Sequence, residues 1–138
     1  MNIATWLERS GRVHADQPAI ALGSQLWCTY EEFAARAARS ATWLVEQGVT
    51  PGDRVALFMT NRPDYLEVQW GIWWAGAVVV PINAKLHERE AAWIVAHSQS
   101  KLVFTDDDRV HTLEQAIEEV QVQARVESQT GFTTDVSL

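Results

Sequence analysis

Four apolar stretches, each separated from the next by a segment of helical character, constrain the fold more than any other feature. They lie at 54–59, 77–82, 102–105 and 120–126. The first three are almost continuously apolar, as is typical of parallel strands covered on both faces. Strands that alternate with helices form βαβ units. The pattern therefore predicts an α/β fold, a three-layer parallel sheet of the Rossmann or flavodoxin type.

A small helix and a hairpin are expected to precede this sheet. The helix is predicted over 2–10, with Gly11 ending it. Two short apolar stretches, 19–22 and 25–28, flank a Gly-Ser pair that is typical of a two-residue hairpin turn. The Thr-Tyr-Glu-Glu segment at 29–32 has the spacing of a capping box. It is expected to begin a long helix.

Three further helices are predicted between and after the strands. Asn61 is expected to cap the first, and residues 65–75 are apolar almost all round, so this helix should be buried on most sides. The other two are expected over 87–97 and 109–119. The three aspartates at 106–108 are expected to cap the last one. A divalent cation at these aspartates is the alternative, because α/β folds bind ligands at the carboxyl ends of strands.

Composition limits the expected partners. The chain has 11 basic and 18 acidic residues and a net charge of −7. This charge repels phosphate backbones and anionic lipid, so neither nucleic acid nor a membrane surface is expected as a partner. The longest mainly apolar run without charge, 70–83, is shorter than the roughly 20 residues of a membrane span. Since the first residues also lack a signal-peptide pattern, a cytoplasmic protein is expected.

Few side chains suggest chemistry by themselves. The single cysteine, Cys28, is expected to be a small packed residue, because no neighbouring base marks it as a nucleophile. The sequence contains no P-loop, dinucleotide-binding or nucleophile-elbow motif. The tryptophans of 65–75 are expected to pack in the core or against a subdomain. The histidines are expected to lie at the surface or to cap helices: His14, His87, His97 and His111.

Four blocks of the sequence point to a known family. They are Thr-Tyr-Glu-Glu at 29–32, Gly-Asp-Arg-Val-Ala at 52–56, Gly-Ala-Val-Val-Val-Pro-Ile-Asn at 76–83 and Ser-Lys-Leu-Val-Phe-Thr-Asp at 100–106. Together they resemble the N-terminal portion of the AMP-forming acyl-CoA synthetases. The adenylate-forming superfamily of these enzymes also includes luciferases and peptide-synthetase adenylation domains. The resemblance implies an N-terminal α/β subdomain over 1–126 and a tail or truncated continuation over 127–138.

The resemblance also implies an activity for the complete enzyme. Such an enzyme joins a small carboxylic acid to ATP and passes the acyl group to the thiol of coenzyme A, with Mg²⁺ as the metal. The family's phosphate loop, ribose-binding aspartate and C-terminal lysine have no counterpart in these 138 residues. We therefore expect no catalytic residue, no metal ligand, no tight cofactor binding and no ligase activity in this chain alone.

Lys85 is the one site residue that the resemblance carries over. It lies in the loop after the strand 77–82, where some CoA ligases place a basic residue near the nucleotide phosphates of coenzyme A. A lysine is a suitable point charge for phosphate, although a solvated loop lysine is the alternative interpretation.

Two other functions are compatible with the sequence. The first is a free-standing flavodoxin-like module that binds a nucleotide or a protein. The second is part of an adenylation domain that loads a carrier protein. A segment of a larger enzyme should leave an apolar face exposed, and we expect self-association through that face.

Overall fold

The structure, a computed structural model, describes residues 1–128, and the sheet lies at its centre. Its strands are β3 (Arg54–Phe58), β4 (Val78–Pro81), β5 (Leu102–Thr105) and β6 (Arg125–Ser128). They pair in the order β4-β3-β5-β6, and every pair is parallel. The predicted α/β class with a parallel sheet is therefore confirmed.

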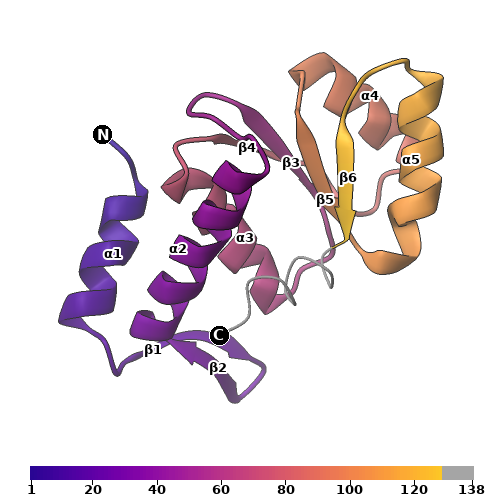
Figure 1. The fold of residues 1–138 in the computed structure, drawn as a ribbon. Coiled ribbons are helices and arrows are strands. Elements are labelled where there is room, and N and C mark those ends of the chain that lie inside the picture. The colour runs from indigo at the N-terminus through magenta and orange to yellow at the C-terminus, as the bar shows by residue number, and fades with distance from the viewer. Residues whose placement is uncertain (129–138) are drawn as a thin grey trace.

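Helices cover both faces of the sheet (Figure 1). The layer on one face contains α2 and α3, with α1 packed against them, and the layer on the other contains α4 and α5. A short 3₁₀ helix, η1 (Asp107–Arg109), leads into α5. The α-helices are α1 (Ala4–Val13), α2 (Tyr30–Glu46), α3 (Pro63–Trp74), α4 (Glu88–Ser98) and α5 (Val110–Glu119).

Strand β3 is the buried centre of this arrangement. Val55 and Leu57 pack in the cluster formed with α2 and α3. Ala56 and Phe58 pack in the cluster formed with α4 and α5, and none of these four residues is exposed. Because both faces of the strand are covered, its sequence is a continuous apolar run rather than an alternation.

The predicted hairpin consists of β1 (Pro18–Leu22) and β2 (Gln25–Thr29), which pair antiparallel. One buried carboxylate attaches it to the helices. Glu67 Oε1 accepts from Trp27 Nε1 at 2.8 Å and from Arg36 Nη1 at 2.8 Å. A two-stranded hairpin is marginal alone, so this contact and the apolar cluster beneath it hold the hairpin in place.

Close helix packing explains two glycines in this layer. Gly11 lies inside α1, and a Cβ there would be 2.7 Å from Ala34 Cβ. The prediction that Gly11 ends the first helix is therefore wrong, because this glycine serves the approach of α1 to α2. At Gly71 of α3, a Cβ would be 2.4 Å from Ser40 Cβ of α2. The half-buried Trp70 and Trp74 of α3 pack against the hairpin cluster, as expected for scaffold residues.

Two predicted boundaries need correction. Asn61 does not cap α3, because the chain stays extended through Arg62, at φ −143° and ψ 160°, and the helix begins at Pro63. The predicted strand 120–126 is wrong in its first half. Gln121 has a left-handed φ of 57°, which breaks an extended chain, and β6 begins only at Arg125. The last residues of the expected tail, 129–138, lie outside the described residues.

Within residues 1–128, no helix combines the length and the apolar character needed to span a bilayer.

Candidate functional site

The carboxyl ends of β3 and β4 open into a groove of about 450 Å³, which we call the edge groove. In open α/β sheets, this edge of the sheet is where ligands bind. Lys85, the predicted site residue, lies in its wall. The lining residues are Met59, Thr60, Asn61, Tyr65, Pro81, Ile82, Asn83, Ala84 and Lys85.

The loop that carries Lys85 has a fixed backbone and an available cation. The Lys85 amide donates to Asn83 Oδ1 at 2.9 Å, and the Leu86 amide donates to the Asn83 carbonyl at 3.1 Å. These bonds close a turn around Lys85. Lys85 is exposed, and within residues 1–128 its ammonium group makes no hydrogen bond or ion pair.

Arg109, from η1 after β5, holds the same loop from the other side. Its Nη1 donates to the Ala84 carbonyl at 2.6 Å and its Nη2 to the Leu86 carbonyl at 2.8 Å. Its Nε donates to Glu88 Oε1 at 2.9 Å. The two carbonyls come from the residues before and after Lys85, so Arg109 contacts the backbone on both sides of the candidate site residue.

Burial and charge strengthen this arrangement. The Arg109 side chain is only 18% exposed, and its Cζ lies 3.9 Å from the centre of the Phe58 ring. A cation over an aromatic face is attracted by the ring quadrupole. The hydrogen bond from Arg109 lowers the pKa of Glu88 below its usual range, which favours the charged carboxylate as the partner of the guanidinium group.

Sequence reasoning assigned no role to Arg109. The sequence nevertheless contains a weak indication that Arg109 and Lys85 lie close together. Arg109 follows β5 closely and Lys85 follows β4 closely, and the carboxyl ends of parallel strands meet at one edge of a sheet.

The aspartates of 106–108 have a different role from the expected one. Asp106 occupies the N-cap position of η1, but its side chain does not cap the helix. Its carboxylate instead accepts from the Thr60 amide at 3.2 Å and from the Thr60 hydroxyl at 3.2 Å. This contact joins the ends of β3 and β5, from which the chain turns to opposite faces of the sheet. The described part of the chain contains no group of acidic, histidine and cysteine side chains able to hold a metal.

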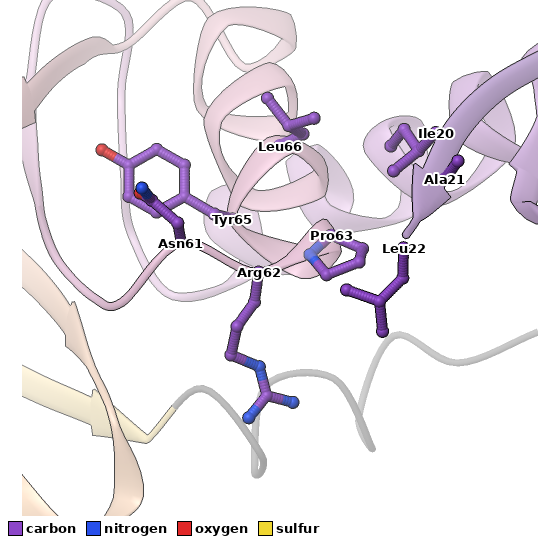
Figure 2. Close-up of a pocket in the computed structure, with 8 residues that line it drawn as sticks. All are labelled: Ile20, Ala21, Leu22, Asn61, Arg62, Pro63, Tyr65 and Leu66. Carbon is purple, nitrogen blue, oxygen red and sulfur yellow. The ribbon is translucent and has the colours of Figure 1, made fainter. Parts of the chain in front are cut away.

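A second groove, of about 330 Å³, separates the hairpin from the start of α3, and we call it the hairpin groove. Figure 2 shows Leu22 of the hairpin opposite Pro63, with Arg62 extended away from the helix. Its lining is mainly apolar, and Asn61 and Tyr65 line both grooves. Arg62 is the one charged residue in this lining, and its Nε pairs with Asp64 Oδ1 at 3.4 Å.

The remaining candidate residues lie outside the lining of the edge groove. Cys28 is 1% exposed, and burial raises the pKa of its thiol to about 11, so it is packed as predicted. The four histidines are exposed. His87 caps α4, since its Nδ1 accepts from the Arg89 amide at 3.1 Å while Glu90 Oε2 accepts from the His87 amide at 2.9 Å.

The fold and the four sequence blocks define one class of protein, the adenylate-forming enzymes. The chain belongs to the AMP-binding enzyme family, which it matches over residues 7–136. It corresponds to the N-terminal portion of such enzymes, as the resemblance implied.

Two relatives of the chain are CoA ligases. The chain is 31% identical over 118 residues to 4-hydroxybutyrate–CoA ligase 2 of Metallosphaera sedula, an alignment that covers 86% of this chain and 21% of that ligase. It is 36% identical over 111 residues to feruloyl-CoA synthase of an Amycolatopsis species, over 80% of this chain and 22% of that enzyme. The chain therefore spans about a fifth of the length of these relatives.

A solved structure supports the same relationship. The crystal structure of a benzoate CoA ligase from Burkholderia xenovorans superposes with a TM-score of 0.84 at 27% identity. The match covers 99% of this chain and 28% of that one.

Proposed function

We propose that this chain is the N-terminal part of an ATP-dependent carboxylic acid–CoA ligase that acts in the cytoplasm. The complete enzyme joins the carboxylate to the α-phosphorus of ATP, which releases pyrophosphate. The thiol of coenzyme A then attacks the acyl-adenylate, and AMP leaves. The family match over residues 7–136, with relatives named as CoA ligases, is the observation that carries this proposal.

In this proposal Lys85 contacts a nucleotide phosphate of coenzyme A. The donor chemistry fits, because the ammonium group is exposed at the groove wall and makes no ion pair within residues 1–128. A phosphate would give it a charge-assisted hydrogen bond. We assign no residue of 1–128 to the binding of ATP or Mg²⁺, and none to the acyl transfer itself.

ATP–pyrophosphate exchange tests the ligase assignment. The 138-residue chain and the longest polypeptide that its gene encodes, which we call the extended polypeptide, are assayed with aliphatic, hydroxylated and aromatic carboxylic acids. We expect exchange with at least one acid for the extended polypeptide and none for the 138-residue chain. Exchange by the short chain, or no exchange by the extended one with any acid, would contradict the proposal.

Replacement of Lys85 tests the acceptor site. In the extended polypeptide, Lys85→Ala should raise the KM for coenzyme A several-fold and leave the exchange rate unchanged, because adenylation does not involve coenzyme A. Lys101→Ala is the matched control, since this lysine lies at the opposite end of the strands and pairs with Asp53. An unchanged KM in Lys85→Ala contradicts the phosphate contact. Acyl transfer to a carrier protein but not to coenzyme A favours the adenylation-domain alternative.

A further inference from the structure

We infer that Arg109 is the positioning residue that orders the Lys85 loop for phosphate binding. This inference rests on the proposed function of Lys85. Arg109 is separated from Lys85 by α4 and β5 in the sequence, yet its guanidinium group lies against the backbone of the Lys85 loop.

The geometry of the guanidinium group is the first argument. Three of its nitrogens donate to three different acceptors, the carbonyls of Ala84 and Leu86 and the carboxylate of Glu88. Arginine presents its donors in a rigid planar fork, whereas lysine carries a compact ammonium group on a flexible stem. A lysine at position 109 cannot span acceptors on both sides of Lys85 as the fork does.

The anchoring of Arg109 itself is the second argument. A residue can position a loop only if its own conformation is fixed. The guanidinium group rests on the ring of Phe58, which is fully buried at the end of β3, and it is paired with Glu88 at the start of α4. The Lys85 loop is thereby attached to the sheet and to the next helix.

The contrast between backbone and side chain is the third argument. Backbone atoms before and after Lys85 are hydrogen-bonded, whereas its ammonium group has no partner among residues 1–128. A backbone that is already ordered lowers the entropy lost when a ligand binds the side chain. Arg109 therefore supports the contact without touching the ligand.

Backbone relaxation of the 138-residue chain tests the inference. We expect amide order parameters of about 0.85 for residues 84–86 in the wild type and below about 0.6 in Arg109→Lys. Arg89→Lys is the matched control, because Arg89 is a 75% exposed arginine of α4 that pairs with Glu119 at the surface. It should leave the loop unchanged. Wild-type order in a folded Arg109→Lys chain, or a mobile loop in the wild type, overturns the inference.

A second variant covers the case in which Arg109→Lys does not fold. Glu88→Gln keeps the guanidinium group but removes the charge that fixes its Nε. It should lower the order parameters of the same residues to values between those of the wild type and a mobile loop. Unchanged order parameters in Glu88→Gln would then overturn the inference.

Adenosine 3′,5′-bisphosphate separates the inference from the proposed function. We expect saturable shifts of the Lys85 amide in the wild type, about tenfold weaker binding in Arg109→Lys, and loss of binding in Lys85→Ala.

Each failure has its own signature in this titration. Binding by Lys85→Ala equal to that of the wild type, or no shift in the wild type, contradicts the phosphate contact and leaves the loop ordering by Arg109 standing. Loss in Lys85→Ala with wild-type binding in Arg109→Lys contradicts the positioning role alone.

Discussion

At the scale of single residues, Gly71 has the least space for a side chain of any glycine in residues 1–128. A Cβ at Gly71 would lie 2.4 Å from Ser40 Cβ, between two packed helices. Gly71→Ala should therefore lower the free energy of unfolding by about 1–3 kcal/mol, as overpacking does. Urea denaturation measures this change. The loss should be smaller when Ser40→Gly removes the opposing Cβ, and an equal loss in both backgrounds would contradict the steric explanation.

Cys28 gives a pH-dependent prediction. Its thiol has a usual pKa of 9.0 and a folded pKa of about 11. The unfolded chain therefore loses this proton first, and stability should fall as the pH rises from about 9 to about 11. Urea denaturation over this range should show a steeper fall for the wild type than for Cys28→Ala, which lacks the group. Parallel curves would mean that the thiol ionises equally well in the folded chain.

Site residues were only partly predictable from the sequence. Lys85 was predicted because a resemblance points to the loop after an apolar strand. The structure places this residue in the groove wall, and its contact with a phosphate stays a prediction. Arg109 was missed because its partners, Ala84 and Leu86, are distant in sequence and are backbone atoms. Such contacts depend on strand order, and strand order does not follow from local periodicity.

At the scale of secondary-structure elements, continuous apolar runs predicted the central strands best. Strand β5 matches its prediction, and β3 differs only at its end. The start of strand β6 was predicted several residues too early in the sequence. The alternating apolar pattern of 120–126 arises from a turn followed by a strand as well as from a single strand. Val122, Ala124 and Val126 do pack against the α4 and α5 cluster, but the first part of this segment is a turn.

Helix α4 depends on an unusual cap, which gives a prediction for this element. His87 closes a capping box in which an imidazole nitrogen replaces the usual oxygen acceptor. His87→Ala should lower the free energy of unfolding by about 0.5–2 kcal/mol, whereas His87→Asn should retain most of the stability. Urea denaturation measures both. His111→Ala is the control, because His111 is exposed within α5, and it should change stability by less than about 0.5 kcal/mol. Equal effects at both positions would rule out the capping role.

At the scale of the whole molecule, the hairpin groove is an apolar surface that the fold of residues 1–128 leaves open. Leu22 is 58% exposed at its rim. We predict that the 138-residue chain self-associates through this groove, because burying such a surface is favourable. Sedimentation velocity over a range of concentrations should show this association, and Leu22→Glu should abolish it.

A matched control identifies the surface involved. Val45 is 57% exposed near the end of α2 and does not line the hairpin groove. Val45→Glu should leave the association unchanged. Equal loss in both variants would indicate non-specific association, and a wild type that stays monomeric would contradict the prediction.

The alternation of side chains along β3 has a consequence for the fidelity of the site. Leu57 and Phe58 are neighbours in the sequence but belong to opposite cores. If β3 slipped by one residue during folding, every side chain would change face, and Phe58 would leave the guanidinium group of Arg109. A chain that folded in this slipped register could still form a compact sheet. Arg109 would then lose the aromatic ring that fixes it against the Lys85 loop. Correct strand register and the proposed phosphate binding therefore both depend on the position of the Phe58 ring.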